Sequence, residues 1–229
     1  MTEMQACSLS TIINMQRSEY NLAIVVLAAG ESSRFDGIKQ LAMVQGDEQS
    51  ETTLLQRTVK VVNALESTSV SVVLGANAQE ILQNSSTIEG VNYITCEQWP
   101  EGMSASIATG CKNIPSQSSH ILIVLADQVA LEQTHFNELI EQSRLHHTNI
   151  ICSQFKTENG ARNSVPAIFP VTLTPQLMSL TGDQGARKII NDSDMDVLSV
   201  LLPEAAIDID TKEQLNDWRK ASANKQDRS

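Results

Sequence analysis

The residues best suited to chemistry stand in one short stretch near the start of the chain, where small residues are followed by two cations. Ala28, Ala29 and Gly30 have little or no side chain, so a ligand can approach the backbone closely. Arg34 and Lys39 follow, and they add positive charge to a chain whose formal net charge is −11. Free backbone N–H groups in such a turn can cradle an anion. The stretch therefore predicts a triphosphate cradle.

An apolar run directly before this cradle predicts the strand that positions it. Residues 22–28 are rich in β-branched side chains, which is typical of a buried, parallel strand. Open α/β sheets bind ligands at the carboxyl ends of such strands. The stretch has neither the spacing of a P-loop nor the glycine pattern of a dinucleotide fold. The alternative interpretation is a surface loop with two solvated cations.

The rest of the chain alternates between strand and helix patterns, which predicts a three-layer α/β fold on a mostly parallel, Rossmann-like sheet. The most apolar run, 120–125, predicts a central strand. A polar stretch at 156–164 predicts a loop, and the prolines of 165–170 predict a strand at a sheet edge. Further strands are expected at 41–44, 70–75, 91–95, from 150, 197–201 and 206–209, and helices after 53, at 77–83, 104–111 and 132–146, after 187, and from 210.

Length and composition are those of one domain. A chain of 229 residues with 41% hydrophobic content suits a single sizeable α/β domain. We expect that domain over residues 21–221, after an N-terminal arm at 1–20 and before a disordered tail at 222–229.

Charge and hydropathy exclude several classes of function. The net charge of −11 disfavours binding to nucleic acid and to an anionic membrane surface. No apolar run approaches the ~20 residues of a membrane helix, and the first residues lack a signal-peptide pattern. The four cysteines are widely spaced, which favours free thiols over a zinc site. These features predict a cytoplasmic protein with no nucleic-acid or membrane partner.

Acidic residues stand where a metal ion would be needed. Asp127 ends the strand beside the cradle, and Mg²⁺ prefers one or two carboxylates together with phosphate oxygens and water. The alternative is that Asp127 only caps the following helix. A second ligand is expected late in the chain, from Asp208 or Asp210, which share one face of an extended segment. We favour Asp208, because Asp210 has a sufficient role as the N-cap of the terminal helix.

Five segments together resemble a known family. Their order and spacing between residues 23 and about 217 are similar to those of the molybdenum cofactor cytidylyltransferases, which are MobA-like nucleotidyltransferases. The segments are Leu27-Ala28-Ala29-Gly30-Glu31-Ser32-Ser33-Arg34 with Lys39, Trp99-x-Glu101-Gly102-Met103-x-x-Ser106, Ala126-Asp127-Gln128, Gly182-Asp183-Gln184-Gly185-Ala186-Arg187, and Asp208-Ile209-Asp210-Thr211.

The resemblance implies a fold of the nucleotide-diphospho-sugar transferase (GT-A-like) type and a Mg²⁺-dependent reaction. CTP and molybdopterin-bound molybdenum would give a cytosine dinucleotide cofactor and pyrophosphate. The nucleophile would be a phosphate monoester that is already ionised, so positioning and charge neutralisation dominate. Arg34 and Lys39 would hold the β- and γ-phosphates, and Asp127 would hold the metal, with Asp208. A molybdenum hydroxylase apoprotein is a further implied partner.

The same resemblance implies the residues that bind the nucleotide. Asp183, Gly185 and Arg187 either shape a pterin pocket or form a helix start with a surface ion pair. The cradle would consist of Leu27, Ala28, Ala29, Gly30 and Ser32, and the border of the base and ribose would consist of Gly75, Gly102, Ser104 and Ser106.

Departures from the family pattern keep other functions open. Cys96 stands where relatives often carry Asn, Val129 replaces a usual Pro, and Asn163-Ser164-Val165 replaces a glycine-containing approach to the acceptor. The alternatives are a guanylyl or other nucleotidyltransferase with a different phosphate acceptor, and a non-catalytic carrier of molybdenum cofactor. The presence of Arg34, Lys39 and Asp127 favours an enzyme over a carrier.

Overall fold

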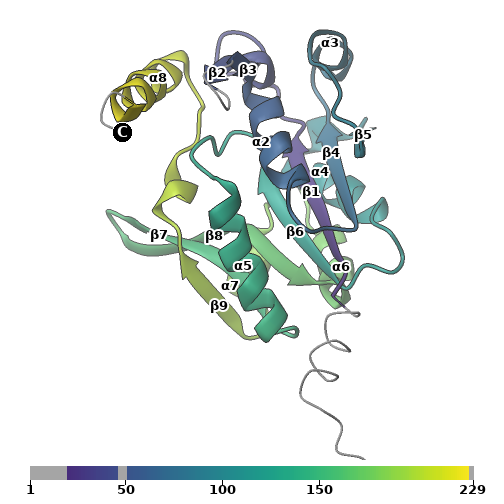
Figure 1. The fold of residues 1–229 in the computed structure, drawn as a ribbon. Coiled ribbons are helices and arrows are strands. Elements are labelled where there is room, and N and C mark those ends of the chain that lie inside the picture. Colours follow the sequence, from purple (N-terminus) through teal and green to yellow (C-terminus); the bar gives the residue numbers. More distant parts are fainter. Residues whose placement is uncertain (1–19, 46–50, 227–229) are drawn as a thin grey trace, which may run out of the picture.

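A seven-stranded sheet forms the centre of the computed structural model, which describes residues 20–45 and 51–226 (Figure 1). In the order β5-β4-β1-β6-β8-β7-β9, every strand except β8 runs in the same direction. The mostly parallel sheet and the central position of 120–125 are therefore confirmed. The strands are β1 (Leu22–Ala28), β4 (Ser69–Leu74), β5 (Val91–Thr95), β6 (His120–Leu125), β7 (Ile150–Thr157), β8 (Gly160–Pro170) and β9 (Val197–Leu201), and a separate ribbon pairs β2 (Met43–Gln45) with β3 (Glu51–Thr53).

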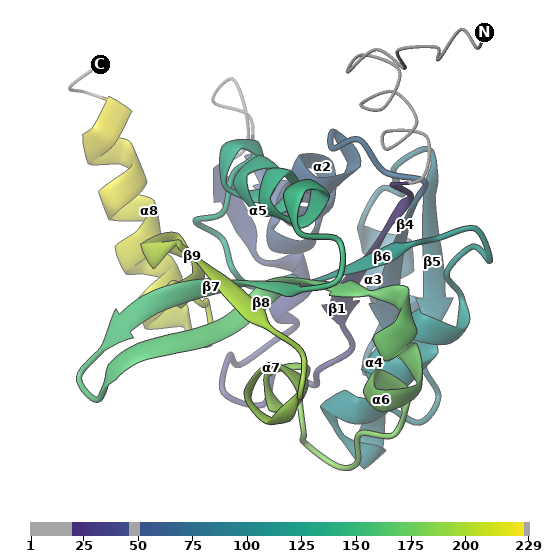
Figure 2. The same cartoon turned by 90° about the horizontal axis from the view of Figure 1, so that it is seen from below.

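Helices cover both faces of the sheet and give the predicted three layers (Figure 2). Side chains alternate between the two faces of a strand, so Ile24 and Val26 of β1 belong to one apolar core while Val25 and Leu27 belong to the other. The first core includes α2 (Leu54–Asn63), α3 (Ala78–Asn84) and α5 (Gln133–Leu145), and the second includes α4 (Met103–Lys112), α6 (Thr174–Met178) and α7 (Arg187–Asp192).

Two predictions for the segment 156–170 are wrong. Residues 156–164 belong to a hairpin of β7 and β8 rather than to a loop, and their polar character reflects a hairpin that projects beyond the covering helices (Figure 2). Strand β8 lies between β6 and β7 rather than at an edge. Its pairing with β7 passes from Ala167 to Ser164, so Val165 and Pro166 lie in a bulge where proline needs no ladder hydrogen bond.

The C-terminal region also differs from its prediction. No strand forms at 206–209, because a 3₁₀ turn at Pro203–Ala206 leads the chain away from the sheet into an irregular segment. Helix α8 (Lys212–Gln226) follows and extends into the segment predicted as the tail. The predicted arm, apart from Tyr20, and residues 227–229 lie outside the described part of the chain.

Two composition-based expectations can be compared with the described residues. None of the helices within 20–45 and 51–226 is long and apolar enough to cross a membrane. Cys96, Cys111 and Cys152 are buried and free, as predicted, whereas Cys7 lies outside the described residues. Burial raises the pKa of Cys111 and of Cys152 to about 12, so both thiols stay protonated at neutral pH.

Candidate active site

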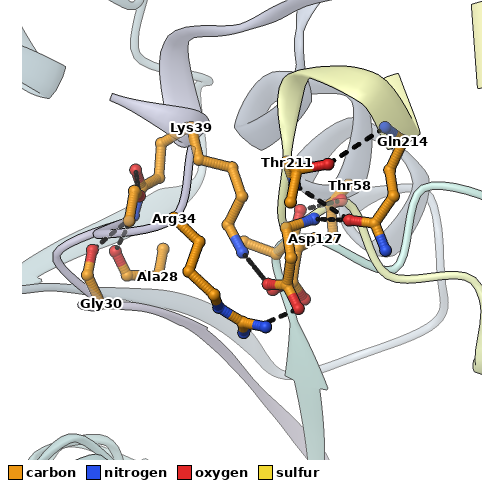
Figure 3. Close-up of polar contacts among 12 residues, drawn as sticks. Ala28, Gly30, Arg34, Lys39, Thr58, Asp127, Thr211 and Gln214 are labelled. Atoms are coloured by element: carbon orange, nitrogen blue, oxygen red, sulfur yellow. Dashed lines mark hydrogen bonds and ion pairs between the residues drawn. The ribbon is translucent and has the colours of Figure 1, made fainter. Parts of the chain in front are cut away.

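The loop after β1 folds around the buried amide of Gln40. Gln40 Nε2 donates hydrogen bonds to the carbonyl oxygens of Ala28 at 2.9 Å and Gly30 at 3.1 Å, and its Oε1 accepts one from the Ser32 hydroxyl at 3.1 Å (Figure 3). Within the described residues, the N–H groups of Gly30, Glu31 and Ser32 donate no hydrogen bond. They are therefore available to an anion, as a phosphate cradle requires.

A cluster of cations and carboxylates lies next to this loop. The Lys39 ammonium is 2.7 Å from the Asp127 carboxylate and 3.0 Å from that of Asp210. The Arg34 guanidinium is 2.9 Å from Asp210 (Figure 3). The Lys39 side chain is only 14% exposed, whereas that of Arg34 is 72% exposed. The three residues predicted to be catalytic, Arg34, Lys39 and Asp127, therefore meet in one cluster.

The segment before α8 brings its carboxylates to Asp127. We call residues 207–211 the strap. The N–H of Ile209 donates to the carbonyl oxygen of Asp127 at 3.1 Å, so Asp208 and Asp210 flank a residue that is fixed to the end of β6. The hydroxyl of Thr58 in α2 donates to the neighbouring carbonyl of Ala126 at 3.0 Å and holds the other side of this turn.

The predicted N-cap role of Asp210 is wrong. The N-cap of α8 is Thr211, whose hydroxyl accepts from the Gln214 N–H at 3.2 Å, while Gln214 Oε1 accepts from the Thr211 N–H at 2.9 Å. Gln214 also accepts from the Asp210 N–H at 2.7 Å. Because this glutamine satisfies the helix start, the Asp210 carboxylate is free to contact Arg34 and Lys39. The reason for preferring Asp208 over Asp210 as a metal ligand is thereby removed.

The cluster carries excess negative charge that a cation would neutralise. The pKa of Asp208 is raised to about 6, mainly by burial and then by the nearby carboxylates of Asp127 and Asp210, against the opposing charges of Lys39 and Arg162. One buried oxygen of Asp127 and one of Asp208 have no hydrogen-bond partner. Such orphaned carboxylate oxygens are suitable ligands for a divalent cation. No cluster of three metal-ligating side chains exists among the described residues, so a bound ion would need further ligands from phosphate or water.

A cleft of about 390 Å³ opens beside the cradle, and Asp127 lines it, whereas Arg34, Asp208 and Asp210 lie outside its lining. Its size is in the range of small-molecule sites. Most of the predicted nucleotide-binding residues line it, together with Lys39 and Asp127. The lining includes Leu27, Ala28, Ala29, Gly30, Ser32, Gly102 and Ser106, and also Trp99, Met103 and Asp183.

Two predicted binding residues lie outside this lining. A side chain at Gly75 would place its Cβ 2.6 Å from the Trp99 Cβ and 2.7 Å from the Ala29 carbonyl oxygen. Gly75 therefore allows Trp99 to pack closely behind the cradle. Ser104 is buried, and its N–H donates to the Gly182 carbonyl at 3.1 Å. Both positions support the wall of the cleft.

The motifs at 99–106 and 182–187 together form one wall of the cleft. The φ angle of Gly102 is +104°, and an added Cβ would overlap the backbone of Gly182. A Cβ at Gly185 would lie 2.9 Å from the Met103 sulfur. Asp183 lines the cleft, whereas Arg187 begins α7. The segment therefore starts a helix and also contributes a carboxylate to the cleft.

The sequence-based prediction did not include Gln40 in this site and did not foresee the contacts of Asp210 with the two cations. Gln40 organises the cradle, and the only signal was its place directly after Lys39 in the first motif. Asp210 binds both cations, but its position before Thr211 suggested a helix cap. In both cases the decisive partner is distant in the sequence or is a backbone group, so spacing alone could not identify it.

The chain is an α/β protein whose cleft lies at the carboxyl ends of parallel strands, the position where open α/β sheets bind nucleotides and other ligands. Residues 24–197 match the model of the MobA-like NTP transferase domain, and the chain belongs to this family. The prediction of a nucleotidyltransferase enzyme is therefore confirmed at the level of the family.

Individual relatives agree with this assignment. The purine catabolism protein PucB of Bacillus subtilis is 30% identical over 130 residues, which are 55% of this chain and 60% of that protein, less than two thirds of its length. The crystal structure of Rv0371c from Mycobacterium tuberculosis has a TM-score of 0.72 at 21% identity, over 88% of this chain and 99% of the other. The 4-diphosphocytidyl-2C-methyl-D-erythritol synthase of Anaerococcus prevotii has a TM-score of 0.70 at 12% identity, over 92% and 99%. These structures share the fold.

Proposed function

We propose that this protein transfers CMP from CTP to a molybdopterin-type molybdenum cofactor and releases pyrophosphate. The observation that carries the proposal is the meeting of Lys39 and Arg34 with Asp127 and Asp210 beside a cradle of free N–H groups. In the transfer, a phosphate oxygen of the acceptor forms a bond to the α-phosphorus of CTP. The bond from that phosphorus to the bridging oxygen breaks, and pyrophosphate takes the electron pair.

The chain's own residues would bind and neutralise the triphosphate. The N–H groups of residues 30–32 bind phosphate oxygens, and Lys39 and Arg34 stabilise the negative charge that develops on the leaving pyrophosphate. The attacking phosphate monoester needs no general base, because it is ionised at neutral pH. Loss of one such cation is expected to lower the rate on the order of a hundredfold.

A divalent cation, Mg²⁺ in our proposal, fits the carboxylate side of the cleft. Asp127 and Asp208 would hold it through their unpartnered oxygens, with Asp210 as a further candidate. When bound, the ion would neutralise phosphate charge. One solved structure of the similarly folded Rv0371c is a complex with manganese.

Two features support the choice of substrates. The Ala28-Ala29-Gly30 form of the cradle motif resembles the cytidylyl branch of the family. Trp99, Met103 and Asp183 line the same cleft, and in our proposal they contact the acceptor. A molybdenum hydroxylase apoprotein as the recipient and a cytoplasmic location remain parts of the proposal. A different phosphate acceptor is the alternative, because the fold also serves a methylerythritol cytidylyltransferase.

Thermal-shift measurements with CTP, GTP, ATP and UTP, each with and without Mg²⁺, test the proposal. We expect the largest metal-dependent stabilisation with CTP, followed by pyrophosphate release when molybdopterin-bound molybdenum is added. Asp127→Asn is expected to abolish pyrophosphate release. Asp192→Asn, which removes a surface carboxylate paired with Lys188, is the matched control. If no nucleotide stabilises the protein, the proposed nucleotidyltransferase activity is refuted. If GTP stabilises it most, the choice of CTP as the substrate is refuted.

A further inference from the structure

Helix α8 contacts the outer side of the loop that carries the cradle. We call residues 29–42 the phosphate-binding loop. Phe35 of this loop is 5% exposed and belongs to a small apolar core with Ile209 of the strap and Leu215 of α8, against which Trp218 packs. This core is separate from the two cores of the sheet. The loop is therefore packed against the end of the chain as well as against β1.

The conformation of the loop needs such support. Ser32 has a φ angle of 62° and Asp36 one of 55°, and both are residues other than glycine in the left-handed region. Such residues cost free energy and persist only where their surroundings hold them. Gln40 holds the first of these turns through the Ser32 hydroxyl. Phe35 lies directly beside the second, so the α8 core stabilises that turn.

Arg219 of α8 makes a two-donor contact with the backbone of this region. Its Nε donates to the carbonyl oxygen of Met43 at 3.2 Å, and one of its terminal nitrogens donates to the same oxygen at 2.5 Å. Met43 begins β2, directly after the loop. Lys212 pairs with Asp36 at 2.7 Å, and an ion pair between two exposed side chains contributes little. Arg219 is also exposed, but two of its nitrogens share one backbone acceptor. Arg219 thus fixes the outgoing end of the loop.

We infer that Arg219 is a positioning residue for nucleotide binding, which it supports from outside the cleft by fixing the exit of the phosphate-binding loop. The inference rests on the proposed function, because it assumes that this loop binds a nucleoside triphosphate. Arg219 is exposed and does not line the cleft. It therefore acts through the backbone of Met43 on the N–H groups of the cradle and on Lys39.

Two measurements on the full chain test this inference, with Lys220→Ala as the control. Lys220 is the next residue of α8, and its contact is an ion pair with Asp217 on the same helix. We expect Arg219→Ala to speed amide hydrogen exchange in residues 29–42 of the free protein, without a change in β4. We also expect it to raise the Kd of Mg²⁺–CTP about fivefold. Arg219→Lys keeps one donor and should recover part of this loss.

The outcomes separate the inference from the proposed function. Unchanged exchange in residues 29–42, or an unchanged Kd, in Arg219→Ala overturns the positioning role. An equal effect of Lys220→Ala also overturns it, because the loss of a charge on α8 would then suffice. If the unsubstituted protein binds no Mg²⁺–CTP, the proposed function fails, and the positioning role for nucleotide binding fails with it. The exchange data then still show whether α8 holds the loop.

Discussion

The ammonium of Lys39 lies 2.7 Å from the carboxylate of Asp127, although 88 residues separate the two in the sequence. Burial lowers the pKa of Lys39, but the charges and hydrogen bonds of Asp127 and Asp210 outweigh burial, and the net pKa is raised. Lys39 therefore stays protonated and neutralises the carboxylates before any ligand binds. In the proposed function, Asp127 would hold a divalent cation that neutralises negative charge, and the Lys39 ammonium would then be available to the phosphates of the nucleotide.

Replacement of Lys39 should therefore impair both stability and activity, whereas replacement of Arg34 should impair activity alone. Lys39→Ala leaves the largely buried Asp127 carboxylate without its counter-ion and leaves Asp210 with Arg34 alone, which we expect to lower the free energy of unfolding by about 2 kcal/mol. Arg34→Ala removes an exposed pair and should cost less than about 0.5 kcal/mol. Urea unfolding measures the first effect, and pyrophosphate release should fall in both variants. An equal loss of stability in the two variants would contradict this account.

The ionisation of Asp208 should make stability depend on pH. Burial, followed by the charges of Asp127 and Asp210, raises its pKa from the ordinary 3.8 to about 6. Between these values the folded state holds a proton that the unfolded chain has released, so stability decreases as pH rises from about 4 to about 6. Asp208→Asn removes this penalty. We expect the variant to exceed the unsubstituted protein by about 2 kcal/mol at pH 8, and the difference to vanish below pH 4.

Urea unfolding at pH 4, 6 and 8 in the presence of a chelator measures this difference. Asp194 is an exposed carboxylate, so Asp194→Asn is the control, and its unfolding should follow that of the unsubstituted protein at every pH. A constant difference between Asp208→Asn and the unsubstituted protein across the three pH values would show that Asp208 does not titrate in this range.

The sequence correctly predicted the helices and strands that depend on residues close together in the chain. The helix expected after residue 53 is α2, and of the two possible caps, Thr52 and Thr53, the structure has Thr53 in a capping box with Gln56. The apolar runs of β1 and β6 became neighbouring parallel strands, and this pairing brought Lys39 and Asp127 to the same end of the sheet. Predictions that rest on a strongly periodic apolar segment therefore succeeded.

Predictions failed where the structure depends on a distant partner. The position of Pro166 inside the sheet depends on a bulge against β7, which the β8 sequence alone does not encode. The role of Asp210 depends on Arg34 and Lys39, which are 176 and 171 residues away in the sequence. In each case a rule that is true on average was overruled by a specific tertiary contact.

The amide of Gln40 should be needed for the shape of the cradle. It is 4% exposed and bonds the carbonyl oxygens of Ala28 and Gly30. Gln40→Ala removes this donor from the buried Ala28 carbonyl and from the Gly30 carbonyl, so we expect a loss of about 2 kcal/mol in the free energy of unfolding and weaker nucleotide binding. Gln133→Ala is the control, because the Gln133 amide also donates to a backbone carbonyl, that of Ala64, but at an exposed site. Urea unfolding and calorimetric titration with Mg²⁺–CTP measure the two effects, and similar losses in both variants would argue against a special role of Gln40.

A methyl group at Gly102, which lies against Gly182, should lower stability by more than backbone strain alone explains. Gly102 has a φ angle of +104° and Gly160 one of +105°, but a Cβ would overlap the Gly182 backbone at the first position and meet nothing within 4 Å at the second. Gly160→Ala should therefore cost about 1 kcal/mol from strain. Gly102→Ala should cost about 2 kcal/mol more, because the overlap forces the two motifs apart. The same displacement moves Asp183 and Met103 at the cleft, so the KM of the acceptor should rise in Gly102→Ala alone. Equal losses in the two urea unfolding curves would mean that the contact between these motifs contributes nothing beyond the backbone conformation of Gly102.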